Sequence, residues 1–183
     1  WRILILSLLV GFSLLLAGCG EKPLLSDVSF SSGRITPNAD HDTDVLVITY
    51  HLNRSAEVSV YFDDQSGRRY YFRNRVRHAP SVDEPYQVYF AGVVDSYTLP
   101  GEQFEGFSVA KRVLQDGTYT WVVEAVDSKG ITERVTGILT IAQADTALPE
   151  LRGFSVYPPV FSPNRDGIAD RATINVDIKK DVE

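Results

Sequence analysis

Short segments in which apolar and polar residues alternate fill the middle of this sequence. Residues 45–52, VLVITYHL, and residues 56–62, AEVSVYF, are the clearest examples. Successive side chains of a β-strand point to opposite faces, so every second residue of these segments shares one face. The residues that we predict to face a core are Leu46, Ile48, Tyr50, Leu52, Val58, Val60 and Phe62. Strands with one apolar face have to bury it against another layer, which predicts packed sheets.

Val, Ile, Thr, Tyr and Phe recur in further short bursts, separated by clusters of Gly, Pro, Asn and Asp. This pattern is typical of strands joined by turns, and runs that favour helices are scarce. We predict strands at residues 28–33, 44–52, 56–63, 68–77, 86–91, 118–127 and 131–141. Their number and spacing predict an all-β fold, namely an immunoglobulin-like or fibronectin III-like β-sandwich.

The composition excludes several classes of function. The chain has 183 residues, enough for one well-buried domain and a little more, and its formal net charge of -6 argues against a nucleic-acid partner. Cys19 is the only cysteine, so no disulfide can form within the chain. The sequence has no nucleophile elbow, no glycine-rich phosphate loop and no metal-ligand spacing among its histidines. It therefore predicts a protein that is not an enzyme.

The N-terminal segment has the features of an export signal. Arg2 precedes an apolar stretch of about 13 residues, the length of a signal-peptide core and shorter than the roughly 20 residues of a membrane-spanning helix. Leu16-Ala17-Gly18-Cys19 resembles the lipobox of bacterial lipoproteins. That resemblance implies a signal-peptide helix at residues 1–18, a lipid on Cys19, a tether at residues 19–26, and membrane anchoring on the extracytoplasmic side of the cell envelope. The alternative interpretations are a signal peptide without lipidation and a buried N-terminal helix.

Two longer stretches carry a second family resemblance. PNADHDTDVLVITYHLNRSAEVSVYFDDQSGRR, followed later by DGTYTWVVEAVDSKG, resembles the immunoglobulin-like module of flagellar hook-capping proteins over residues 27–142. The chain departs from that module at Phe90-Ala91-Gly92 and in an insertion at residues 95–112. Proteins that contain this module have many different functions, so the resemblance implies a fold and no particular activity.

Tyr119 occupies a position of structural interest within that module. It lies two residues before Trp121, which we predict to face the core. This is the position of a tyrosine corner, in which the tyrosine hydroxyl bonds to the backbone a few residues upstream. An ordinary buried tyrosine on a strand is the alternative, and either interpretation makes the residue structural.

The sequence also contains an internal repeat. TPNADHDTDVLVITYHL, residues 36–52, returns as SPNRDGIADRATINVDI, residues 162–178, with Pro37 and Pro163 126 residues apart (163 − 37 = 126). We therefore predict a linker at residues 143–150 and the start of a second sandwich at residues 151–183. Two strands without the rest of their sandwich leave an edge and an apolar face uncovered, so we expect a truncated module from a longer tandem array.

Both copies of the repeat contain a loop rich in Asp and Asn. The oxygen-bearing residues are Asp40, Asp42 and Asp44 in the first copy and Asn164, Asp166 and Asp170 in the second. Closely spaced carboxylates and amides around a tight turn can bind a hard cation, which makes calcium the one candidate cofactor. The other interpretation is that these side chains bond to their own backbone in Asx-turns.

A stripe of arginines follows the second alternating segment. If RRYYFRNRVR is one regular strand, Arg69, Arg73, Arg75 and Arg77 share a face. Guanidinium groups bind carboxylates and phosphates through two parallel hydrogen bonds, so the stripe is a candidate site for an anionic polymer. The other interpretation is a solvated outer face whose charges are balanced by nearby Asp and Glu residues.

Two hypotheses of function follow. The first is a non-catalytic, lipid-anchored protein of the cell envelope whose sandwich modules act as a scaffold, a stalk or an adhesive unit, with a surface protein or polysaccharide as partner. The second is that the chain is the anchor and spacer of a larger cell-surface enzyme, for example a polysaccharide hydrolase, whose catalytic domain follows residue 183.

Overall fold

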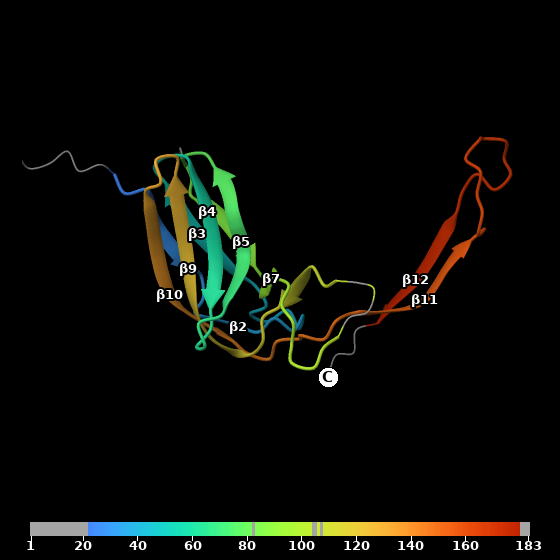
Figure 1. Cartoon of the computed structure of the whole chain (residues 1–183), viewed down its shortest axis with the longest axis horizontal. Helices are drawn as coiled ribbons and strands as arrows, with labels where there is room; N and C mark the ends of the chain where they lie inside the picture. The colour runs from blue at the N-terminus through green and yellow to red at the C-terminus, as the bar shows by residue number, and fades with distance from the viewer. Residues whose placement is uncertain (1–21, 82, 104–105, 107, 180–183) are drawn as a thin grey trace, which may run out of the picture.

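The structure, a computed structural model, describes residues 22–81, 83–103, 106 and 108–179. These residues form an all-β protein (Figure 1). Its strands are β1 (Leu25–Phe30), β2 (Arg34–Ile35), β3 (Leu46–Leu52), β4 (Ala56–Asp63), β5 (Arg69–His78), β6 (Tyr86–Phe90), β7 (Val93–Asp95), β8 (Lys111–Val113), β9 (Gly117–Asp127), β10 (Thr132–Ile141), β11 (Glu150–Tyr157) and β12 (Thr173–Lys179). The described residues contain no helix that could cross a membrane.

Two sheets pack face to face as a β-sandwich, which confirms the predicted all-β fold. One sheet has the strand order β1-β3-β6 and the other the order β2-β10-β9-β4-β5. Neighbouring strands in both sheets are antiparallel, except that the short β2 pairs parallel with β10. Aromatic rings stack between the sheets, Phe30 on Trp121 with centroids 4.1 Å apart and Phe90 on Phe62 with centroids 4.5 Å apart.

The alternation predicted the core correctly. All seven residues named for it are at most 1% exposed, and they are Leu46, Ile48, Tyr50, Leu52, Val58, Val60 and Phe62. The predicted strands that correspond to β3, β4, β5, β6, β9 and β10 agree with the structure to within two residues at each end. Strict alternation with one buried face is therefore a reliable signal in this chain, because each of these strands has its apolar side against the opposite sheet.

The first strand begins earlier than the sequence predicted. β1 starts at Leu25 instead of residue 28, Leu24 before it is completely buried, and the carboxylate of Glu133 accepts the Leu25 N–H at 2.8 Å. The predicted tether at residues 19–26 is thus wrong at its C-terminal end. The cause is a bulge at Asp27, which has a φ of 51° and shifts the register of β1 against β3, so the alternation is interrupted.

The predicted linker at residues 143–150 is also attached to the sandwich at its start. The N–H groups of Gln143 and Ala144 donate to the carboxylate of Asp116, and the N–H of Asp145 donates to the Pro37 carbonyl. The free part of the linker is therefore shorter than predicted.

The insertion at residues 95–112 packs onto the sandwich. It contributes to the two-stranded sheet of β7 and β8, and the Arg112 side chain on β8 is 3% exposed. The Arg112 guanidinium forms a bidentate ion pair with Glu102, and the Tyr97 hydroxyl donates to the Val113 carbonyl at 2.6 Å. A buried charge has to be paired, so this ion pair holds the insertion in place.

The β11–β12 hairpin repeats the β1–β3 pair. In the first pair Leu25 faces Leu52 and Phe30 faces Ile48, with a register shift after Ser26. Every one of these relationships returns 126 residues later, since Leu151 faces Ile178, Val156 faces Ile174, and the register shifts after Arg152. The sequence repeat is therefore a structural repeat down to its bulge.

The two copies differ in what covers them. The apolar side chains of the hairpin are exposed, with values of 66% for Phe154, 39% for Val156, 64% for Ile174, 43% for Val176 and 65% for Ile178. The corresponding residues of the first copy belong to the core or pack against it, and they are Val28, Phe30, Ile48, Tyr50 and Leu52. Figure 1 shows the hairpin projecting beyond the sandwich, at the end of the segment that follows β10.

Candidate functional site

The predicted lipidation residue, Cys19, lies outside the described residues. The first described residues, which would follow the predicted anchor, are bound to the sandwich. The Asn53 side chain donates to the Pro23 carbonyl at 2.8 Å, and Arg54 donates to the Lys22 carbonyl at 2.9 Å. The chain therefore reaches the sandwich beside the turn between β3 and β4.

The first Asp-rich loop is organised around Asp44. Its carboxylate accepts the backbone N–H groups of Asn38, Ala39 and His41 at 2.7–3.0 Å. The side chains of Asn38 and Asp40 each accept the N–H of the residue two positions further on. Burial raises the pKa of the Asp44 carboxyl, but the three N–H donors outweigh it and hold that pKa below its ordinary value. These contacts are Asx-turns, the second of the two interpretations predicted for the loop.

The second loop has most of the same bonds. Asp170 accepts the N–H groups of Arg165 and Gly167, both at 2.7 Å, and Asn164 and Asp166 again bond two positions ahead. The left-handed backbone positions also coincide at a spacing of 126 residues, and they are Ala39, His41 and Thr43 in one loop and Arg165, Gly167 and Ala169 in the other. Among the described residues no group of three or more His, Cys, Asp or Glu side chains could hold a metal ion. The calcium site stays a prediction.

The predicted arginine stripe is divided by the structure. Arg69 forms two hydrogen bonds with Asp63, at 2.8 and 2.9 Å, and its guanidinium lies 3.7 Å from the centre of the Tyr61 ring. The bonds to Asp63 raise the pKa of Arg69 above its ordinary value. Arg75 pairs with Glu57 at 2.7 Å through its Nε atom. Both cations thus have a carboxylate partner on β4.

Arg73 lies on the opposite side of β5, and the prediction of a single arginine face is wrong for it. It pairs in register with the core residue Val60 and lines a cavity of about 240 Å³ together with Tyr50 and His78. Register shifts on both sides of Val60, with a φ of 51° at Arg75, interrupt the alternation of β5. In this cavity burial raises the pKa of Tyr50 to about 12, and burial together with the charge of Arg73 lowers the pKa of His78.

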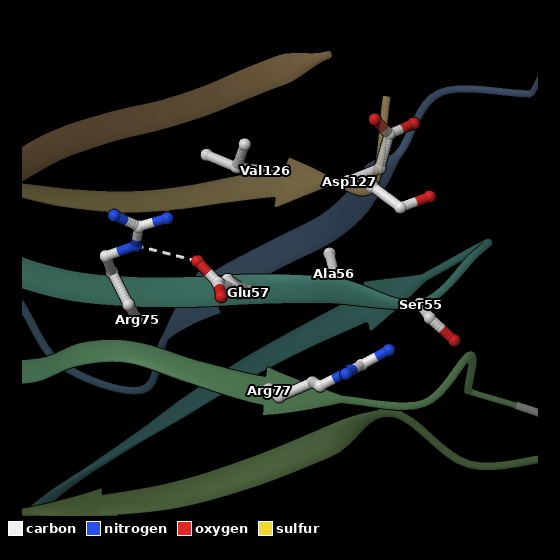
Figure 2. A pocket seen from close by; sticks show the side chains of 8 residues that line it. Ser55, Ala56, Glu57, Arg75, Arg77, Val126 and Asp127 are labelled. Carbon is white, nitrogen blue, oxygen red and sulfur yellow. Dashed lines mark hydrogen bonds and ion pairs between the residues drawn. The ribbon is translucent and has the colours of Figure 1, made fainter. Parts of the chain in front are cut away.

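Arg75 and Arg77 line an open groove on the outer side of the five-stranded sheet, shown in Figure 2. The groove has a volume of about 320 Å³ and is lined by Ser55, Ala56, Glu57, Arg75, Arg77, Val126, Asp127 and Ser128. These residues lie on three neighbouring strands or next to their ends, because β4 pairs with β5 on one side and with β9 on the other. In particular, Ala56 faces Asp127 across one pair and Glu57 faces Arg77 across the other.

The carboxylate of Asp127 is fully engaged within the protein. Its side chain is 4% exposed, accepts the N–H groups of Lys129 and Ile131 at 2.9 and 3.0 Å, and binds Arg54 at 3.2 Å. Burial raises the pKa of this carboxyl, but these donors outweigh it and keep the pKa below its ordinary value. Asp127 therefore shapes the groove and leaves little acceptor capacity for a ligand.

Arg77 is the cation of the groove that stays available. It is exposed, and within the described part of the chain its guanidinium has neither a hydrogen bond nor an ion pair. Figure 2 shows its side chain extended along β5 toward Ser55, which lies just before the start of β4. Since Glu57 is paired with Arg75 and Asp127 with Arg54, one positive charge in the groove has no counterion there.

Sequence reasoning identified two of the groove residues and missed the others. Arg75 and Arg77 were named for the stripe, whereas Ser55, Glu57 and Ser128 gave no local signal. Ser55 and Ser128 each lie next to the end of a predicted strand, and the pairing of β4 with β9 brings them to the same end of the sheet. Only the pairing of strands distant in sequence could have indicated this site.

Comparison with known proteins yields no match, either to a protein-family model or, at a significant level, to a curated protein. The groove can bind an anionic group through Arg77 and hydroxyl groups through Ser55, Ser128 and the exposed part of Glu57.

Proposed function

We propose that this chain is a non-catalytic, lipid-anchored protein of the bacterial cell envelope, and that its β-sandwich is the first of several consecutive modules. In this role the modules form a scaffold or stalk that holds a binding surface outside the membrane. The proposal combines the lipobox resemblance at Leu16-Ala17-Gly18-Cys19 with the repeated hairpin.

The observation that carries the proposal is the identity of register between β1–β3 and β11–β12. The pairing, the bulge and most of the loop hydrogen bonds return after 126 residues. The hairpin is equivalent to two strands of a sandwich and has the same apolar face. In a complete module that face would be buried against a second sheet. This supports a tandem arrangement in which β11 and β12 are the opening strands of another module.

Three features support an immunoglobulin-like module in particular. Sheets of three and five strands face each other, the short β2 pairs parallel with the last strand of the sandwich, and Tyr119 carries the bond expected of a tyrosine corner. The Tyr119 hydroxyl donates to the carbonyl of Gln115, four residues upstream, at 2.8 Å.

The length of the chain between anchor and sandwich supports a role close to the membrane. Leu24 is already buried in the core, and only five residue steps separate it from Cys19. Fully extended, these steps span at most about 17 Å. A lipid on Cys19 would thus hold the first module near the bilayer surface, and the β11–β12 end would extend away from it.

The experiment is expression with the native leader in a bacterial host that makes lipoproteins, with labelled palmitate in the medium. We expect label in the membrane fraction, and we expect globomycin to block processing. A Cys19→Ser variant should be unlabelled, and the lipoprotein signal peptidase should no longer cleave it. A wild-type product that is secreted without label would contradict the proposal.

A further inference from the structure

We propose that the groove between β4, β5 and β9 binds a carboxylate-bearing sugar, such as a uronic acid unit of an acidic polysaccharide, with Arg77 as the residue that binds the carboxylate. This inference concerns a ligand site and does not depend on lipid anchoring. The groove has a volume of about 320 Å³, at the lower end of the range for small-ligand sites. This size suits a short piece of polymer lying in an open groove.

The unpaired positive charge in the groove favours a ligand group with a single negative charge. Arg77 has no partner within the described part of the chain, whereas Arg75 is held by Glu57 at 2.7 Å and Asp127 by Arg54 at 3.2 Å. A guanidinium presents two parallel N–H donors that match the two oxygens of a carboxylate. The Glu57 carboxylate, 40% exposed beside the site, would repel a phosphate dianion more strongly than a carboxylate.

The remaining surfaces of the groove suit the rest of a sugar. The hydroxyls of Ser55 and Ser128 make no hydrogen bond within the described chain and can donate to or accept from ring hydroxyls. Glu57 supplies an acceptor for a sugar hydroxyl. Val126 provides a small apolar surface on which the C–H face of a sugar ring can lie. A simple carboxylic acid would leave these polar groups unused.

The test is calorimetric titration of the protein with the tetramer of galacturonic acid, in low-salt buffer at pH 7. The same tetramer as its methyl ester is the ligand control, because it keeps the hydroxyls and lacks the charge. We expect the acid to bind and the ester to bind at least about tenfold more weakly, the value of one charged hydrogen-bonded contact.

The matched variants are Arg77→Gln and Arg69→Gln. Both remove one positive charge from β5, but Arg69 is paired with Asp63 and lies outside the groove. We expect Arg77→Gln to weaken binding at least about tenfold with an unchanged melting temperature, because its side chain is exposed and unpaired within the described chain. We expect Arg69→Gln to change binding less than about twofold, although it removes the two bonds to Asp63.

Several results would overturn the inference. The first is wild-type protein that shows no heat of binding to the tetramer at millimolar concentration. The second is an equal loss in both variants, which would indicate a diffuse charge effect. The third is displacement of the tetramer by inorganic phosphate at an equal concentration, which would indicate a general anion site.

Discussion

The indole ring of Trp121 lies directly over the Cα atom of Gly137, its pairing partner on β10. A Cβ atom built on Gly137 would lie 2.4 Å from an indole carbon, and the other side of the indole stacks on Phe30 with the planes 11° apart. The indole is therefore held between a phenyl ring of one sheet and a bare backbone position of the other. Any side chain at residue 137 has to displace it.

Gly137→Ala should consequently destabilise the sandwich. We expect a loss of about 1–3 kcal/mol in the free energy of unfolding, the usual cost of overpacking a core, measured by urea denaturation with Trp fluorescence. Gly33→Ala is the control, because a Cβ at Gly33 meets no atom within 4 Å. Equal stability of the two variants would mean that the indole can move away at no cost.

Tyr119→Phe tests the bond to the Gln115 carbonyl. The side chain is 6% exposed, so removal of its hydroxyl leaves a carbonyl without its donor, and we expect a loss of about 1 kcal/mol. Tyr89→Phe, at a tyrosine that is 69% exposed, should change stability by less than about 0.5 kcal/mol. An unchanged urea midpoint for Tyr119→Phe would indicate an ordinary buried tyrosine without a structural bond.

Acid should weaken the ion pair between Glu102 and Arg112. The bonds from Arg112 hold the pKa of Glu102 below its ordinary value of 4.5, so its contribution is present above that value and is lost as the pH falls through the folded-state pKa. We expect Glu102→Gln to melt at a lower temperature than wild type at pH 7, with the difference closing as the pH falls below 4.5.

Asp95→Asn is the matched control for that pH series. Asp95 pairs with Lys111 on the same small sheet, but both partners are about half exposed, so this pair should contribute little at any pH. If the difference in melting temperature between wild type and Glu102→Gln were the same at pH 3 and pH 7, the ion pair would not be the source of that difference.

Asp44→Ala should open the first Asp-rich loop. We expect faster amide hydrogen exchange at Asn38, Ala39 and His41, because these N–H groups lose their acceptor. Asp42→Ala should leave exchange unchanged, since the Asp42 carboxylate makes no hydrogen bond within the described chain.

Melting of the wild-type protein and of Asp42→Ala in calcium and in chelator decides between the two interpretations of the loop. Because the Asp44 oxygens already accept three N–H groups, we expect equal melting temperatures in calcium and in chelator. A rise in the wild-type melting temperature with calcium that Asp42→Ala abolishes would instead show that the loop binds the metal.

Ile48 and Ile174 are equivalent residues of the repeat in opposite environments. Ile48 is completely buried, so Ile48→Ala should cost about 2–5 kcal/mol. Ile174 is 64% exposed, so Ile174→Ala should leave the unfolding of the sandwich within about 0.5 kcal/mol of wild type and reduce the binding of an apolar dye. A large loss of stability from Ile174→Ala would show that the hairpin face is covered in solution.

Alternation was informative wherever a strand is regular. β3 could be predicted with its buried residues, because its alternation runs without a break and one face lies against the opposite sheet. On β4 the alternation predicted the core-facing residues, but Ser59 and Tyr61 on the other face are buried too. Bulges limited the prediction elsewhere. The bulge at Asp27 concealed the start of β1, and the register shifts around Val60 moved Arg73 to the other face of β5. The strands β2, β7 and β8 have two or three residues, too few for a period to be recognised.

The amino-acid sequence by itself determined the class of the fold, part of its core and the existence of a repeat, because these depend on local alternation and on similarity between segments. Tertiary structure alone decided which charges are available. Arg69, Arg75 and Arg77 look alike along β5, yet two of them have a carboxylate from β4 and the third does not. The groove beside Arg77 exists because β4 pairs with β5 and β9 at once, and pairing between strands far apart in the chain leaves no local trace in the residues that form it.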